Sequence, residues 1–159
     1  MPHSTPGSAA GGADDWRRHL LDDGAAIRAL LQRVRRIAVL GIKTPDGFPP
    51  AHYVPEAAQR AGYEVIPVPV YYPEVTELLG QPVYRRVADI PGPPVDLVDV
   101  FRRPQDLPAH LDDLLAARPG AVWLQSGIRH AEVAETLARA GIDVVQDRCL
   151  MVEIQRAGR

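Results

Sequence analysis

Five short runs of β-branched and apolar residues recur along this chain, and stretches with helical character separate them. The runs cover residues 36–41, 63–68, 95–101, 121–125 and 142–146, and the clearest helical stretches cover residues 104–117 and 131–140. Strands that alternate with helices of this length form a mostly parallel sheet with helices on both faces. The pattern therefore predicts an α/β fold with a Rossmann-like, doubly wound sheet. Prolines in residues 82–94 leave room for at most a short strand in that segment.

The segments before the first strand bear on the domain organisation. With 159 residues, the chain is long enough for one domain with a hydrophobic core. Residues 1–13 are small and rich in Pro, Gly and Ser, which is typical of a disordered leader. From Asp14 or Asp15 to Val34 apolar residues recur at helical spacing, and Gly24 predicts a break in this N-terminal helical segment. We therefore expect a single domain over residues 14–159.

Charge and cysteine content exclude several classes of protein. The formal net charge is -2, so no excess of positive charge favours nucleic acid or an anionic membrane as a partner. The single cysteine, Cys149, excludes an internal disulfide framework and is typical of a reducing compartment. No apolar run approaches the roughly 18 residues of a membrane helix, and the N-terminus lacks the apolar core of a signal peptide. We expect a cytoplasmic protein.

The loop after the first predicted strand is the first candidate for a binding site. In an open parallel sheet, ligands bind beyond the carboxyl ends of the strands. Gly41 allows the backbone to turn sharply there, and the helix that follows would point its N-terminus toward a phosphate. Lys43 and His52 are candidate contacts to that phosphate. The alternative is an ordinary surface connection in which Lys43 is solvated and His52 caps the helix.

The end of the second predicted strand argues against NAD. A NAD-binding unit carries Asp or Glu at this point to accept the ribose hydroxyl, whereas this strand ends in "IPVPV". A carboxylate there would repel a ribose that bears a phosphate, and both NADP and coenzyme A carry such a phosphate. Pro67, Val68 and Pro69 would instead form an apolar ledge for an adenine ring. The alternative is that these prolines only terminate the strand.

Polar and charged residues also follow the third and fourth predicted strands. Arg102 and Arg103 present fork-shaped donors suited to phosphate, although an adjacent surface pair is often only solvated. Gln125 and Ser126 end the fourth strand, and Gly127 opens its turn. The residues that we expect to contact the ligand are Gly41, Ile42, Lys43, Thr44, His52, Tyr53, Pro67, Val68, Pro69, Phe101, Arg102, Arg103, Gln125, Ser126 and Gly127.

Several segments together resemble a known family. They are "IAVLG", "PAHYV", "GYEVIPV", "LGQPVYRRVADIP", "VDLVDVFRRPQDLP", "VWLQSGIR" and "DRCLMVE". In this order they resemble the small bacterial and archaeal CoA-binding proteins, which are similar to the CoA-binding N-terminal domain of the succinyl-CoA synthetase α subunit. The resemblance covers about residues 30–155. It implies a single Rossmann-like domain that binds coenzyme A in the crevice, and it implies no known reaction.

The sequence departs from the pattern of that family at two places. The second strand of the family commonly continues as Pro-Val-Asn-Pro, whereas this chain has Val70 at the end of Pro-Val-Pro-Val and so lacks the amide. The first loop of the family often carries Ser after the Gly and Arg before the proline. This chain has Ile42 and Lys43 after the Gly and Phe48 before the prolines, so Lys43 is the substitute phosphate contact. The phosphorylated His domain of the related synthetases has no room here.

No set of residues predicts catalysis. Cys149 lacks a His with clear partner spacing, and lone cysteines usually pack in the core. Asp99 and Asp147 lack a matched partner for acid–base chemistry, and the sequence has no cluster with metal-ligand spacing. We therefore interpret the chain as a non-catalytic regulatory or carrier module that binds coenzyme A or an acyl-CoA. The alternatives are an NADP-type Rossmann oxidoreductase and a nucleotide-binding subunit of an acyl-CoA synthetase-like complex, which would need a protein partner.

Overall fold

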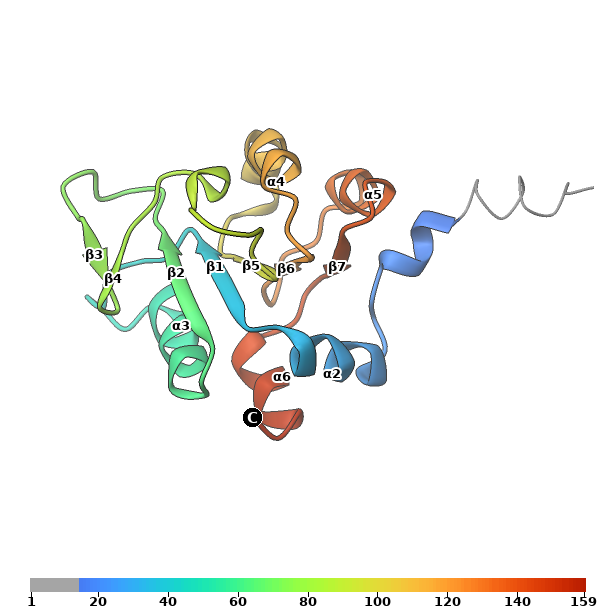
Figure 1. Cartoon of the computed structure of the whole chain (residues 1–159), viewed down its shortest axis with the longest axis horizontal. Helices are drawn as coiled ribbons and strands as arrows, with labels where there is room; N and C mark the ends of the chain where they lie inside the picture. Colours follow the sequence, from blue (N-terminus) through green and yellow to red (C-terminus); the bar gives the residue numbers. More distant parts are fainter. Residues whose placement is uncertain (1–14) are drawn as a thin grey trace, which may run out of the picture.

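The computed structural model describes residues 15–159 and contains a five-stranded parallel sheet, as the sequence predicts (Figure 1). The expected leader, residues 1–13, lies outside the described residues. The strands of the sheet are β1 (Arg36–Leu40), β2 (Glu64–Val68), β5 (Leu97–Val100), β6 (Ala121–Leu124) and β7 (Asp143–Val145). They lie in the order β2-β1-β5-β6-β7. Each strand falls within a predicted run, shortened by one to three residues.

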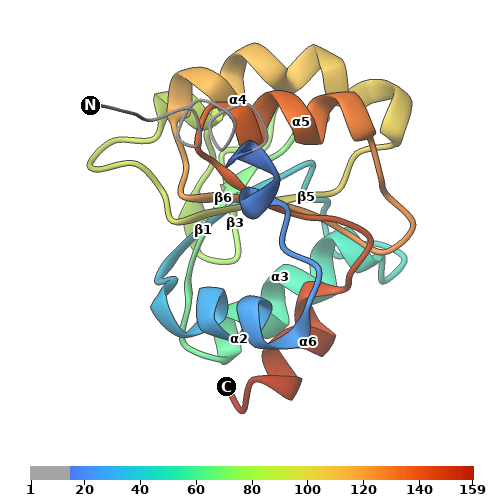
Figure 2. The same cartoon turned by 90° about the vertical axis from the view of Figure 1, so that its right-hand side faces the viewer.

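Helices cover both faces of the sheet, which makes it doubly wound. α2 (Gly24–Arg33), α3 (Pro50–Arg60) and α6 (Leu150–Arg156) lie on one face, and α4 (Leu111–Ala117) and α5 (Ala131–Arg139) lie on the other (Figures 1 and 2). Because side chains alternate along a strand, β1 contributes to two separate cores. Ile37 and Val39 join the cluster on the α2 side, while Ala38 and Leu40 join the cluster on the α4 side.

The N-terminal helical segment is broken where Gly24 predicts it. A 3₁₀ helix, η1 (Asp15–His19), comes first, and α2 begins at Gly24 with Asp23 as its N-cap. The Asp23 carboxylate accepts a hydrogen bond from the amide of Ala26 at 2.8 Å, which satisfies one of the free donors of the first turn. Between the two helices, the amide of Leu21 donates to the carbonyl of Val144 in β7. This segment therefore covers the outer edge of β7.

Prolines explain where the structure is more irregular than the sequence pattern. The segment before β5 forms a short hairpin of β3 (Glu77–Leu78) and β4 (Gln81–Pro82), followed by η2 (Val87–Asp89). The stretch predicted as one helix over residues 104–117 is divided into a 3₁₀ helix, η3 (Pro104–His110), and α4, and it carries Pro108. Pro67 lies within β2 because β2 is the edge strand of the sheet.

The strand order places one topological switch point in the sheet. From β1 the chain crosses to β2 on one side, and from β2 it returns to β5 on the other side of β1. The connections that leave β1 and β5 therefore diverge, and a crevice opens between the carboxyl ends of these two strands. The loops after β1, β2 and β5 surround this position.

Candidate functional site

Gly41 forms the floor of the switch-point crevice. Its φ of +89° lies in the left-handed region, and a Cβ atom at this position would lie 2.4 Å from the carbonyl oxygen of Phe101. The amide of Gly41 donates to the carbonyl of Val68 at 2.9 Å, and the amide of Phe101 donates to the carbonyl of Leu40 at 2.9 Å. The ends of β1, β2 and β5 are thus joined by backbone contacts that leave no space for a side chain. Such a position allows the backbone to approach a ligand closely.

The loop that follows Gly41 is tied to α3. Nδ1 of His52 lies 2.9 Å from the carbonyl oxygen of Lys43, so this nitrogen carries a proton and donates it. The amide of Lys43 donates to the carbonyl of Ala51 at 3.1 Å. The side chain of Lys43 is exposed, whereas Ile42 and His52 are buried. His52 therefore holds the loop, and Lys43 remains available to an anion.

Two other predicted residues of this region differ in their surroundings. The hydroxyl of Thr44 donates to the carboxylate of Asp46 at 3.1 Å, a contact within the loop. Tyr53 lies on the first turn of α3 and is exposed. α3 begins after Pro49, which supplies no side-chain cap, so its first turn keeps the positive end of the helix dipole uncompensated by a side chain.

Arg102 and Arg103 take different positions after β5. The side chain of Arg102 is 15% exposed, and that of Arg103 is 72% exposed. The Cδ atom of Arg102 would lie 3.2 Å from a Cβ atom on Gly41, so Arg102 lines the crevice. Asp106 lies 3.7 Å from Arg102 and accepts a hydrogen bond from Arg103 at 2.9 Å. One carboxylate therefore pairs with both guanidinium groups of the predicted pair.

His110 and Tyr71 complete the surroundings of Arg102. Nε of Arg102 donates to Nε2 of His110 at 3.1 Å, which requires that this nitrogen be unprotonated. Burial, with the nearby positive charge of Arg102, lowers the pKa of His110 and keeps the ring neutral. Nη1 of Arg102 donates to the hydroxyl of Tyr71 at 3.4 Å, and this hydrogen bond lowers the pKa of Tyr71. The guanidinium is therefore held in place from two sides.

Gln125 is turned into the core rather than into the crevice. It is 5% exposed, and its Nε2 donates to Oδ1 of Asp99 at 2.5 Å. Its Oε1 accepts from the amide of Leu150, the first residue of α6, at 3.4 Å. Asp99 is completely buried, and its Oδ2 has no hydrogen-bond partner. Burial raises the pKa of Asp99 to about 7, and the hydrogen bond from Gln125 opposes that rise.

Ser126 and Gly127 lie at the edge of a different hollow. The amide of Gly127 donates to Oδ1 of Asp147 at 2.7 Å, and this hydrogen bond lowers the pKa of Asp147. Ser126 lines a cavity of about 510 Å³ next to the end of β7, together with Arg129, Arg148 and residues of the N-terminal segment and α6. Its volume exceeds those of four other hollows, which measure about 110 to 260 Å³. Of the predicted ligand contacts, Ser126 lines this cavity and the others do not.

The end of β2 presents a different apolar surface from the predicted one. Pro67, Val68 and Pro69 are all buried, so their side chains do not form an exposed ledge. Tyr71, two residues farther along, is 58% exposed and was not among the predicted contacts. The sequence signal for it is the aromatic pair Tyr71 and Tyr72, which comes shortly after the buried strand end.

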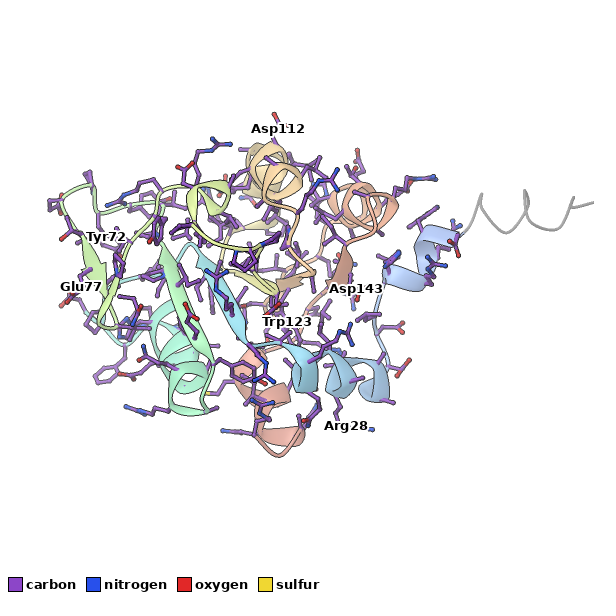
Figure 3. The ribbon with its side chains drawn as sticks, in the orientation of Figure 1. Arg28, Tyr72, Glu77, Asp112, Trp123 and Asp143 are labelled. Atoms are coloured by element: carbon purple, nitrogen blue, oxygen red, sulfur yellow. The ribbon has the colours of Figure 1, made fainter. Side chains whose placement is uncertain are left out.

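Cys149 lies beside the cavity at β7, away from the crevice at the switch point. Cys149 is half-buried, packs against the apolar cluster on the α6 side and lines the β7 cavity. Trp123, labelled in Figure 3, is fully buried, and its indole N–H donates to the carbonyl of Arg148 at 2.8 Å. Within residues 15–159 no group of three or more His, Cys, Asp or Glu side chains is placed to hold a metal ion. No helix in this described part is long and apolar enough to cross a membrane.

Known proteins are similar to this chain in sequence and in fold. A family model described as a CoA binding domain matches residues 35–155. The Bacillus subtilis (strain 168) protein YneT is 38% identical over 129 residues, which cover 80% of this chain and 91% of YneT. The structure of cell-free ID.343 from Thermus thermophilus is 47% identical and superposes with a TM-score of 0.77, over 86% of this chain and 99% of that one.

A larger synthetase contains the same fold. A dinucleotide-forming acetyl-coenzyme A synthetase 1 from Ca. Korarchaeum cryptofilum, solved in complex with phosphate and ADP, superposes with a TM-score of 0.59. The match covers 74% of this chain but 27% of the synthetase, and the two sequences are 20% identical over it. At this identity the likeness concerns the fold alone.

Proposed function

This chain belongs to the CoA-binding domain family, and on that premise we propose that it binds coenzyme A or an acyl-CoA at the switch-point crevice. One observation carries the position of the site. Gly41 meets the backbone of Phe101 at the switch point, and the guanidinium-bearing side chain of Arg102 lies against the same glycine. A site for a phosphorylated nucleotide needs this combination, because the backbone must approach the phosphates and a cation must balance them.

Each charged residue of the crevice has a role in this proposal. Arg102 pairs with a phosphate group of coenzyme A, and the exposed Lys43 approaches from the first loop. Asp106 balances both arginines in the absence of a ligand. A phosphate that approaches Arg102 replaces Asp106 as its anionic partner. Arg103 contributes less than Arg102, because its side chain lies mostly in solvent and is held by Asp106 at 2.9 Å.

We further propose that the chain acts as a regulatory or carrier module rather than as an enzyme. The buried acid Asp99 is enclosed by the sheet and bonded to Gln125, so it does not reach the crevice. Cys149 lines the cavity near β7, and no general base is bonded to its thiol among the described contacts. The alternative is an obligate partner that supplies the chemistry, as in an acyl-CoA synthetase-like complex.

A second alternative is an NADP-type oxidoreductase, because β2 ends without the acidic residue that would repel a ribose phosphate. Thermal unfolding with matched concentrations of coenzyme A, NADP and NAD separates the two functions. A ligand at a hundredfold excess over its Kd stabilises the native state by about 2.7 kcal/mol. We expect a clear rise in Tm with coenzyme A and none with NAD. A larger rise with NADP would favour the oxidoreductase, and no rise with any ligand would contradict nucleotide binding.

A further inference from the structure

The large apolar side chains exposed in the described part of the chain lie on the segments that directly follow β1 and β2. Four large apolar side chains are exposed within residues 15–159, namely Phe48, Tyr53, Val70 and Tyr71. Phe48 and Tyr53 belong to the loop after β1 and the first turn of α3, and the other two belong to the loop after β2. Exposed apolar groups that gather at one place on a surface mark a binding site more often than scattered ones do.

Tyr71 is the member of this group that contacts the proposed phosphate-binding arginine. The guanidinium carbon of Arg102 lies 5.7 Å from the centre of the Tyr71 ring, and Nη1 donates to its hydroxyl at 3.4 Å. The ring is 58% exposed, so the arginine covers only part of it. An open aromatic face and a cation thus lie next to each other at the crevice. The base and the phosphate of a nucleotide are likewise neighbours, since only the ribose separates them.

The loop that carries Tyr71 is held rigidly. The guanidinium group of Arg85 donates to the carbonyls of Tyr71, Tyr72 and Val75 at 3.0, 2.9 and 2.8 Å. Tyr72 has a φ of +62°, in the left-handed region that favours glycine. Residues are held in such conformations mostly where the surrounding contacts impose them, often at ligand sites. Figure 3 shows Tyr72 on the β2 side of the molecule, away from Asp143 of β7.

Tyr72 also contacts its neighbour. The rings of Tyr71 and Tyr72 are 6.5 Å apart and nearly perpendicular, at 88°, which is a favourable edge-to-face geometry. Together with the Arg85 contacts, this geometry fixes the direction of the Tyr71 ring before any ligand arrives. A preformed ring loses little conformational entropy when a flat ligand stacks on it.

We propose that Tyr71 is a ligand-binding residue of this site and stacks against the adenine ring of coenzyme A. The inference rests on the proposed function, and it moves the adenine platform from the buried Pro67–Pro69 segment to the exposed loop that follows it. Stacking on a ring face accepts any base, because every base has a π face. Recognition of the nucleotide therefore depends on Tyr71 for the base and on Arg102 for a phosphate.

Calorimetry with two ligands tests this role. The ligands are coenzyme A and 4′-phosphopantetheine, which lacks the base, and the proteins are the wild type, Tyr71→Ala and Tyr71→Phe. We expect Tyr71→Ala to weaken coenzyme A by roughly five- to a hundredfold, the usual loss for one stacked base. Its affinity for 4′-phosphopantetheine should match the wild type, because the base is absent from that ligand. Tyr71→Phe keeps the ring and should keep most of the affinity for coenzyme A.

The outcomes separate the two proposals. If the wild type does not bind coenzyme A, the proposed function and this inference both fail. If the wild type binds but Tyr71→Ala binds equally well, only the stacking role is wrong. Equal losses for both ligands would mean that Tyr71 acts through Arg102 alone. A changed oligomeric state of Tyr71→Ala with unchanged affinity would assign the ring to a protein interface. An unchanged Tm of Tyr71→Ala is the folding control, since the ring is largely exposed.

Discussion

Asp99 is an acid in the core of the sheet, where Gln125 donates to its Oδ1 and its Oδ2 has no hydrogen-bond partner among the described residues. Neighbouring strands place Val39 and Trp123 beside it. A charged carboxylate in such surroundings is costly, because water no longer solvates it. Burial accordingly raises its pKa from 3.8 to about 7. At neutral pH the acid therefore lies close to its titration midpoint.

The raised pKa of Asp99 predicts a pH dependence of stability. Between about pH 4 and pH 7 the folded protein keeps a proton on Asp99 that the unfolded chain releases. The stabilising contribution of this proton is complete below pH 4 and is lost as the pH rises through about 7. Asp99→Asn cannot titrate, so the Tm of this variant relative to the wild type should rise from pH 4 to pH 7 and level off above it.

Asp147→Asn provides the control for this experiment. The amide of Gly127 lowers the pKa of Asp147, so its contribution to stability is present at neutral pH and lost on acidification. The difference in Tm between Asp147→Asn and the wild type should therefore become small at acidic pH. Between pH 4 and pH 7 this difference should stay constant, unlike the difference expected for Asp99→Asn. If the Tm of the wild type and the Tm of Asp99→Asn change in parallel with pH, the raised pKa of Asp99 is contradicted.

The two adjacent arginines provide a second prediction at this scale. Arg102→Ala should weaken coenzyme A by at least about tenfold, because a charge-assisted hydrogen bond contributes roughly 1.5–3 kcal/mol. Arg103→Ala is the matched variant and should cause a smaller loss, since its side chain is 72% exposed. Calorimetry with pantetheine, which has no phosphate, should show no effect of either change. Equal losses for both variants would place both arginines on the phosphates.

At the scale of the elements, the turn after β1 determines where a ligand can approach. Gly41 and Gly47 lie in the same loop and both have positive φ values, +89° and +79°. A Cβ atom on Gly41 would lie 2.4 Å from the Phe101 carbonyl oxygen, whereas nothing lies within 4 Å of a Cβ atom on Gly47. A substitution at Gly47 therefore measures backbone strain alone, whereas a substitution at Gly41 adds a steric conflict between the ends of β1 and β5.

We expect Gly47→Ala to lower the free energy of unfolding by about 1 kcal/mol, the cost of a left-handed conformation. Gly41→Ala should cost clearly more, because the ends of β1 and β5 must also move apart. Urea denaturation measures both values. The same displacement should weaken coenzyme A in Gly41→Ala, because the phosphate-binding turn is distorted. Similar losses of stability for the two variants would show that the close contact at Gly41 relaxes without cost.

At the scale of the whole molecule, the two halves of the sheet have different surroundings. The switch point lies between β1 and β5, next to the loops that carry Arg102 and Tyr71. The large cavity lies at the other end, where the N-terminal segment covers β7. His19 Nδ1 lies 2.7 Å from Asp143, which also accepts from Arg33 at 3.1 Å, so both parts of that segment contact the start of β7. The large cavity and the proposed coenzyme A site therefore lie at different places along the sheet.

The alternation of strands and helices was predictable because it depends on residues that are close in the sequence. The periods of apolar residues identify β1, β2, β5, β6 and β7, and Gly24 correctly marks the break before α2. The parallel sheet follows from the lengths of the connections. The residues that follow each strand could thus be chosen as candidates without any structure. Their roles as ligand contacts stay predictions.

Tertiary structure alone decided how those candidates are oriented. The order of the strands brings Gly41 against Phe101, although 60 positions separate them in the chain. The register of β5 and β6 pairs Asp99 with Trp123, and Gln125, two residues farther along, turns its amide into the core toward the Asp99 carboxylate. Packing likewise buries Pro67–Pro69 and leaves Tyr71 exposed beside Arg102. These contacts join residues far apart in the sequence, and local patterns of apolar residues carry no information about such pairs.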